Sequence, residues 1–223
     1  MKLLSDNMSQ AFSIGRLMLL LTGMLVLGAC ASTPLESDTP PPLKNAGPPV
    51  QVADVDVLEV SPEMEAFLDR YVLKYRNPHT RMELLITAVT RSGVLGFQYD
   101  ETMTKTASEA FKARAGNCVA FSNLMVALAR RAGLEASYQE VLLSAEWSDF
   151  EDDTVLLYKH VNVVIETGQM SWIVDVSGIK IRQSDPRRIV EDSYAKALYF
   201  NNIAVESLLE KDLPTAFASV TSA

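Results

Sequence analysis

The chain has 223 residues, of which 48% are hydrophobic and 22% charged, and its formal net charge is −8. This composition is typical of a globular protein and excludes a disordered chain and a polytopic membrane protein. Nucleic-acid binding needs a basic surface to neutralise phosphates, so we expect no nucleic-acid partner. Two cysteines and two histidines are too few for a zinc finger or an iron–sulfur cluster. Because the chain also lacks a Gly-rich phosphate loop, we expect no cofactor.

The N-terminus resembles a lipoprotein signal peptide. An apolar run over residues 17–29 follows Lys2 and Arg16, and it is shorter than the roughly 20 apolar residues that span a bilayer. The run ends in Leu-Gly-Ala-Cys at Cys30, which resembles the bacterial lipobox, where cleavage before the cysteine is coupled to acylation of its thiol. The alternative is a secretory signal with a chance cysteine. We predict that the mature protein begins at a lipidated Cys30.

The residues after Cys30 predict where the protein is held. Residue Ala31 is not Asp, which by resemblance to the enterobacterial sorting pattern favours the outer membrane, with the domain facing the periplasm. An acidic chain is not held on anionic lipid by charge, so the acyl chains would be its anchor. The stretch 30–51 is rich in proline and small polar residues and predicts an extended tether. The folded part is expected to begin near Val52.

Helical patterns open the folded part. An apolar stripe with helical spacing predicts a first helix over 61–72, and we interpret Asn-Pro at 77–78 as a break after it. A capping-box pattern predicts a second helix over 80–90. A third short helix is predicted over 106–114, and we expect Gly116 to end it.

The most apolar helix comes next. Asn117 is a good N-cap and Gly133 a good C-cap, and alanine, leucine and methionine dominate the residues between them. Because apolar residues occur on all sides of this helix, we expect it to be buried at the centre of the domain. Cys118 would lie in its first turn.

The hydrophobic period then changes from helical spacing to alternation. Three strands are predicted over 135–143, 156–166 and 171–177, with a hairpin turn at 167–169 between the last two. We interpret the acidic stretch 146–153 as a solvated loop, because it lacks the spacing of a calcium-binding EF-hand. Helices followed by an antiparallel sheet indicate an α+β fold.

Helical spacing returns in the tail, where helices are predicted over 187–212 and 213–221. The predicted organisation has four parts: a signal peptide, 1–29; a lipidated cysteine and tether, 30–51; a main domain, 52–186; and C-terminal helices, 187–223.

Cys118, His160 and Asp175 are the candidates for chemistry. If Cys30 is acylated, Cys118 is the one free thiol. A lone cysteine is usually an inert small hydrophobe, but the N–H groups and dipole of a first helical turn stabilise a thiolate. His160 and Asp175 lie on the two strands of the predicted hairpin, where 160 pairs roughly with 175 or 176, so the carboxylate can orient the imidazole. We interpret His79 as structural or exposed.

The stretch 114–134, with His160 on one strand and Asp175 on the next, resembles the transglutaminase-like superfamily. The resemblance covers about residues 80–180. It implies a papain-like fold in which a Cys–His–Asp triad follows that order along the chain, here Cys118, His160 and Asp175.

Within this superfamily, the chain resembles bacterial lipoproteins that join the domain to tetratricopeptide helices. Residues 199–212 look like a first such helix, and at most one repeat is present, so no extended binding array can form. These C-terminal helices are still a candidate surface for a protein partner. Val161-Asn162 and Val176 differ from an aromatic residue and a proline that many members have there, and these departures concern the substrate more than the triad.

The mechanism that the resemblance implies is acyl transfer through a thioester. Cys118 attacks a peptide or amide carbonyl, His160 protonates the leaving amine, and Asp175 holds the ring in its tautomer. The backbone N–H of Cys118 is one donor to the oxyanion, and a side chain of Gln98 or Tyr99 is a candidate for the second. The alternative for Gln98 and Tyr99 is packing in the core.

Two functions remain open. The first is an outer-membrane-tethered periplasmic cysteine enzyme, a thiol protease or amidase or a transglutaminase, acting on a peptide, protein or peptidoglycan-type amide. The second is a catalytically silent module of the same fold that binds a periplasmic protein. A metal site at Cys118, His160 and Asp175 would have only three ligands and no CxxC or HxxxH companion, so we expect none.

Overall fold

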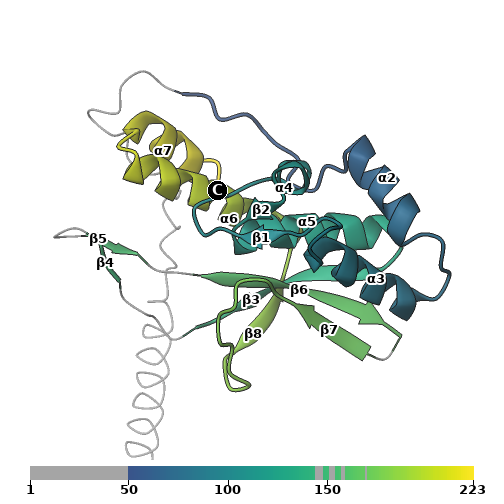
Figure 1. Ribbon diagram of the computed structural model, residues 1–223. Coiled ribbons are helices and arrows are strands. Elements are labelled where there is room, and N and C mark those ends of the chain that lie inside the picture. The colour runs from purple at the N-terminus through teal and green to yellow at the C-terminus, as the bar shows by residue number, and fades with distance from the viewer. Residues whose placement is uncertain (1–49, 144–147, 151–153, 157–158, 169) are drawn as a thin grey trace, which may run out of the picture. The chain divides into compact units, whose positions relative to one another are not determined.

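Figure 1 shows the computed structural model of the protein. The structure describes residues 50–143, 148–150, 154–156, 159–168 and 170–223. All described residues belong to one compact unit of the chain. The predicted signal peptide, Cys30 and nearly all of the predicted tether lie outside the described residues. Among the helices of the described part, none has the length and apolar character needed to cross a membrane.

Two helices begin the described fold, each started by a side-chain cap and a proline. Ser61 caps α2 (Pro62–Tyr71), and Asn77 caps α3 (Pro78–Thr90). The fixed φ of proline suits the first helical position, where its missing N–H would have no acceptor anyway. The predicted start of the second helix at Thr80 is therefore wrong, because the Asn-Pro pair that we interpreted as a break begins the helix.

A short parallel ladder leads from the third helix to the next. α4 (Ala107–Ala113) ends at Arg114, which adopts a left-handed conformation with φ of 56°. The chain then enters β2 (Ala115–Gly116), which pairs with β1 (Gln98–Tyr99). We had expected Gly116 to end this helix. That prediction is wrong, because Arg114 already turns the chain.

Gly116 serves a different purpose, which is close packing. A Cβ atom added at this position would lie 2.5 Å from the Cβ of Ala120 and 3.2 Å from the carbonyl oxygen of Met103. Only a glycine therefore lets β2 pass so close to the first turn of α5 (Cys118–Arg131). This contact determines where the helix bearing Cys118 begins relative to β1.

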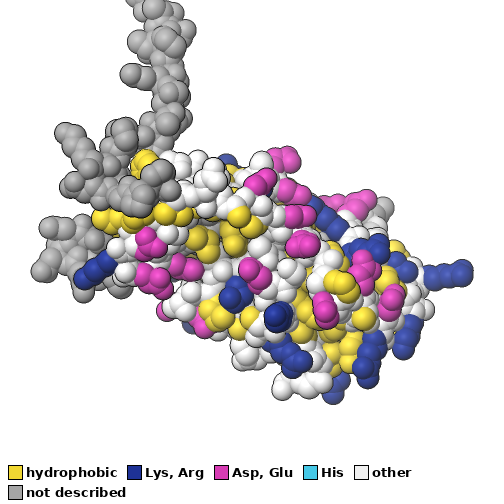
Figure 2. Space-filling model, turned by 90° about the horizontal axis from the view of Figure 1, so that it is seen from above, with side chains coloured by type: hydrophobic (Ala, Val, Ile, Leu, Met, Phe, Trp, Pro, Cys, Tyr) yellow, Lys and Arg dark blue, Asp and Glu magenta, His cyan; other side chains and the backbone are white. Residues whose placement is uncertain are grey.

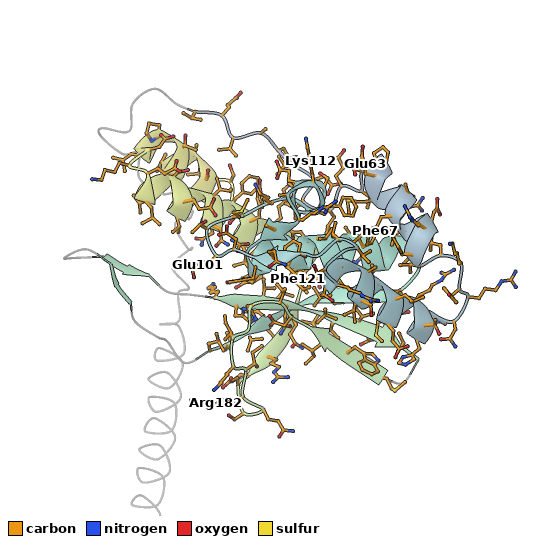
Figure 3. The ribbon with its side chains drawn as sticks, in the orientation of Figure 1. Glu63, Phe67, Glu101, Lys112, Phe121 and Arg182 are labelled. Atoms are coloured by element: carbon orange, nitrogen blue, oxygen red, sulfur yellow. The ribbon has the colours of Figure 1, made fainter. Side chains whose placement is uncertain are left out.

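Helix α5 is the buried centre of the fold, as predicted. The side chain of Asn117 accepts a hydrogen bond from the N–H of Ala120 and donates one of 2.7 Å to the hydroxyl of Thr104. Every residue from Val119 to Ala129 is buried. The Phe121 ring lies in this interior, 5.2 Å from the ring of Phe97 (Figure 3).

Four antiparallel strands form a sheet in the order β7-β6-β3-β8. They are β3 (Glu135–Val141), β6 (His160–Thr167), β7 (Met170–Val174) and β8 (Arg187–Val190). Alternate residues of β6, namely Val161, Val163 and Ile165, join the hydrophobic core. Helices α3 and α5 contact this sheet and lie on one side of it (Figure 1). The predicted α+β fold is confirmed.

Two further predictions differ from the structure. The helix predicted over 187–212 begins only at α6 (Asp192–Leu209), because β8 first pairs with β3 and completes the sheet. The tail 187–223 is therefore not helical throughout. Within the acidic stretch 146–153 that we expected to be a loop, β4 (Ser148–Phe150) forms a short strand, which pairs with β5 (Thr154–Leu156) just after the stretch.

The last two helices contact each other, and the first of them also packs on α5. Arg130 of α5 binds both carboxylate oxygens of Asp192 at the start of α6, at 2.5 and 2.9 Å. Asp212 caps α7 (Leu213–Val220). Similarity of this pair to a tetratricopeptide unit stays a prediction.

Gly116→Ala tests the close packing at the start of α5. We expect a loss of about 1–3 kcal/mol in the free energy of unfolding, because the added methyl group overpacks a buried contact. Urea denaturation measures this loss. In an Ala120→Gly background, which removes the facing methyl group, the same substitution should cost less; an equal cost in both backgrounds would contradict the proposed contact.

Candidate active site

Three side chains from distant parts of the chain meet at one end of the sheet. Cys118 is the first residue of α5, His160 is the first residue of β6, and Asp175 directly follows β7. Nε2 of His160 lies 2.5 Å from Oδ2 of Asp175, and the Cys118 thiol interacts with the same ring. The hydroxyl of Ser122 donates to the carbonyl of Val161, which joins the first turns of α5 to the start of β6.

The strand register differs slightly from the predicted one. The β6–β7 ladder pairs Val163 with Val174. Continued by one residue, this register places Asp175 opposite Asn162 rather than opposite His160. Asp175 therefore reaches His160 diagonally, across two residues of the neighbouring strand, a separation that polar side chains can bridge.

Each oxygen of the Asp175 carboxylate has a partner. Oδ1 accepts hydrogen bonds from the backbone N–H and the hydroxyl of Ser177, at 2.9 and 2.8 Å. Oδ2 faces His160 and accepts a longer bond, 3.4 Å, from the side chain of Asn162. Burial raises the pKa of Asp175, but His160 and Ser177 outweigh it and lower the pKa to about 2. The carboxylate is therefore ionised at neutral pH.

The sequence analysis did not identify Asn162 and Ser177 as site residues. Asn162 was noted only as a departure from a family pattern. Its place two residues after His160 in a strand is the signal that could have found it, since residues i and i+2 share a face. Ser177 follows Asp175 by two residues, a spacing at which an Asp side chain commonly binds the backbone N–H in a turn.

The His160 ring is almost completely enclosed, with 2% of its side chain exposed. Burial alone lowers the pKa of His160, but the hydrogen bond with Asp175 and the nearby Cys118 sulfur, with the charges of both groups, raise it to about 9. Asp175 occupies Nε2. The other nitrogen, Nδ1, is buried and has no hydrogen-bond partner of regular geometry among the described residues. It is therefore the atom left to exchange a proton with the sulfur.

Cys118 presents a free thiol that is half-buried. As the first residue of α5, it has a backbone N–H with no acceptor within the helix. Neighbouring N–H groups at the same end carry the positive end of the helix dipole. The site thus combines a reactive type of side chain, an enclosed imidazole and an ionised carboxylate.

The oxyanion candidates Gln98 and Tyr99 lie on β1, opposite Ala115 and Gly116 of the strand that leads into α5. Both are exposed, so the alternative of core packing is wrong. The side-chain amide of Gln98 donates to the carbonyls of Gly96 and Phe97, at 3.1 and 3.3 Å. A role for either residue in binding an oxyanion stays a prediction.

The second histidine belongs to another cluster. His79, in the first turn of α3, lies 3.4 Å from Glu83 and packs its ring 5.3 Å from that of Trp172. In the described part of the chain, no group of three or more His, Cys, Asp or Glu side chains is arranged to hold a metal ion.

The raised pKa of His160 predicts that stability falls as the pH rises. The folded protein keeps this proton up to about pH 9, whereas an unfolded histidine loses it near 6.5. The stabilisation of the folded state by this proton is therefore complete below pH 6.5 and is lost as the pH rises from 6.5 to 9. Urea denaturation should show a decrease of roughly 2–4 kcal/mol over this range.

His160→Gln should flatten this pH profile, and Asp175→Asn should flatten it partly, because each removes the interaction that retains the proton. The same slope in wild type and His160→Gln would contradict the assignment.

Comparison with known proteins gives one match. The profile of the Transglutaminase-like superfamily matches residues 68–178, about half of the chain. This range contains Cys118, His160 and Asp175. No curated protein and no solved structure matches the chain.

Proposed function

We propose that this protein, which carries a transglutaminase-like superfamily domain at residues 68–178, is a cysteine enzyme that transfers an acyl group through a thioester. The domain indicates a papain-like cysteine enzyme or a related module. The observation that favours the enzyme is the arrangement at His160, where Asp175 holds one ring nitrogen and the Cys118 thiol interacts with the ring. Core packing alone would not need an ionised carboxylate beside an enclosed imidazole.

The first half of the reaction would form the thioester. The Cys118 thiolate attacks the carbonyl carbon of an amide, and the negative charge moves to the carbonyl oxygen. The backbone N–H of Cys118 can donate to that oxygen. When the tetrahedral intermediate collapses, the carbon–nitrogen bond breaks and the imidazolium of His160 gives its proton to the leaving amine.

The second half would release the acyl group. Water or an amine attacks the thioester carbonyl, and neutral His160 accepts the proton that the nucleophile loses. The carbon–sulfur bond then breaks and the thiolate returns, paired again with the imidazolium. With water the product is a carboxylic acid, as for a protease or amidase, and with an amine it is a new amide. Asp175 keeps the ring in place throughout.

We also propose a place for the enzyme in the cell. Lipidation at Cys30 and the tether over 30–51 would hold the domain of residues 52–186 at the outer membrane, facing the periplasm. Substrates there include proteins and peptidoglycan-type amides.

The C-terminal helices are a candidate surface for a protein partner. Four apolar side chains at the α6–α7 junction and the end of α7 are 42–47% exposed: Leu208, Leu209, Leu213 and Val220. Apolar side chains left in water favour contact with another protein. This surface supports partner binding whether or not the domain is also an enzyme.

Alkylation tests the reactive thiol. At about pH 6, iodoacetamide should modify Cys118 in the folded protein about tenfold faster than in the urea-unfolded protein, because an ordinary cysteine is then almost entirely a neutral thiol. Mass spectrometry after short exposures gives both rates. His160→Gln should remove the difference. Slow labelling that begins only on unfolding would favour the silent module.

Turnover tests the enzyme directly. Wild type should hydrolyse members of a peptide-amide library, and Cys118→Ala should abolish turnover while the circular dichroism spectrum stays unchanged. Full complementation of a gene deletion by Cys118→Ala would show that catalysis is not the biological role.

Cys30→Ala tests the anchor separately. Without an acylated residue, the protein should move from the membrane fraction to the soluble periplasmic fraction on cell fractionation. A matched Ser32→Ala variant should stay in the membrane. Retention of Cys30→Ala in the membrane would contradict lipid anchoring and leave the chemistry of the domain untouched.

A further inference from the structure

A polar cluster beside His160 has no part in the acyl-transfer steps. It consists of Glu140 on β3, Lys159 directly before β6, Arg188 on β8 and Tyr194 on α6. Glu140 is 1% exposed, and its carboxylate accepts a hydrogen bond of 2.6 Å from the Tyr194 hydroxyl and another of 2.6 Å from Nε of Arg188. Both oxygens of this buried carboxylate are therefore used.

Two cations lie against a single ring in this cluster. The Arg188 guanidinium is 5.0 Å and the Lys159 ammonium 5.6 Å from the centre of the Tyr194 ring. Lys159 also donates to the Tyr194 hydroxyl at 3.2 Å. Burial raises the pKa of Glu140, but its hydrogen bonds and both cations lower it below its usual value, so it is ionised. One negative charge against two positive ones leaves the cluster cationic.

Both cations of the cluster are exposed to solvent. Arg188 binds Glu140 through Nε, its guanidinium lies over the Tyr194 ring, and its side chain is 56% exposed. Lys159 is exposed and makes one hydrogen bond. Glu140 and the Tyr194 ring hold this exposed guanidinium, whose terminal edge carries two parallel N–H groups. This is the geometry that binds a carboxylate with two hydrogen bonds.

The cluster lies next to His160 along the strands, and Glu140 is on the opposite face of the sheet from His160. Lys159 directly precedes His160, and in the β3–β6 ladder Glu140 pairs with Val161 while Val141 pairs with His160. The formal charge of the whole chain is −8, so a general excess of basic residues does not explain the cluster. On the helix side of the molecule, by comparison, acidic and basic side chains are interspersed (Figure 2).

We propose that Lys159 and Arg188 form a subsite for a carboxylate of the acyl-transfer substrate. The proposal rests on the function proposed above and adds a substrate class: peptides that carry a carboxylate close to the amide that reacts. Either an acidic side chain or a free chain terminus supplies that group. Glu140 and Tyr194 are positioning residues, which hold Arg188 with its outer edge toward the ligand.

Three chloroacetyl probes test the subsite without knowledge of the natural substrate. They are chloroacetyl-glutamine amide, which is neutral; chloroacetyl-glutamate amide, with a side-chain carboxylate; and chloroacetyl-glutamine, with a terminal carboxylate. In each reaction the Cys118 thiolate forms a carbon–sulfur bond as the carbon–chlorine bond breaks and chloride leaves. The readout is the second-order rate of alkylation, measured by mass spectrometry on the full chain.

At low ionic strength, wild type should react about three- to tenfold faster with at least one acidic probe than with the neutral probe. Added salt should reduce this preference, because it screens exposed charges. The faster acidic probe identifies which source of carboxylate fits the subsite.

Lys159→Gln should reduce the preference, and Lys159→Gln with Arg188→Gln should bring the ratio near one. Loss of Arg188 leaves buried Glu140 with one partner, so Arg188→Lys provides a second variant. It keeps the positive charge but removes the planar guanidinium with its paired N–H groups. This variant should retain only part of the preference for the acidic probe. Arg182→Gln is the matched control. Arg182 is an exposed cation in the loop between β7 and β8 (Figure 3), and its loss should leave all three rates unchanged.

Equal rates with all three probes in wild type would overturn the carboxylate subsite while the reactive thiol stands. A preference that survives in the double variant would overturn it too, and would assign the effect to His160 or to the field of the whole protein. If none of the probes modifies Cys118 in the folded protein, the proposed acyl-transfer function fails and the subsite fails with it.

Discussion

The hydrogen bond between Asp175 and His160 is the interaction on which the chemistry of this domain depends. An enclosed imidazole would by itself give up its proton, since burial disfavours charge. Asp175, together with Cys118, reverses this preference and raises the pKa of His160 to about 9, and Asp175 is itself kept ionised by His160 and Ser177. The pair therefore stores a proton beside the Cys118 thiol at neutral pH.

The helix and the sheet are built so that the sulfur meets this pair. Asn117 caps α5 and is tied to Thr104, while Gly116 lets the preceding strand pass within reach of Ala120. The Asn117 cap and the close packing at Gly116 therefore fix the position of the helix start that carries Cys118. Packing of this kind holds a reactive group more precisely than a loop could.

A second carboxylate, that of Glu140, is buried and has a different task. Asp175 directs its charge to an enclosed histidine, whereas Glu140 directs its charge to the exposed cation of Arg188. The pair of Asp175 and His160 thus holds a proton, and the pair of Glu140 and Arg188 orients a guanidinium. The two pairs use successive positions of the same ladder, where Val141 pairs with His160 and Glu140 pairs with Val161.

The sequence by itself determined the features that depend on local interactions: the capped and buried helix with Cys118 in its first turn, the hairpin strands of His160 and Asp175, and the α+β order. Caps, turns and hydrophobic periods act within a few residues and can be read directly. Only the tertiary structure decided the register that sets Asp175 opposite Asn162, the pairing of the Arg-rich strand β8 with β3, and the use of Gly116 for close packing. Each of these depends on contacts between segments distant in the chain, whose energies no local pattern contains.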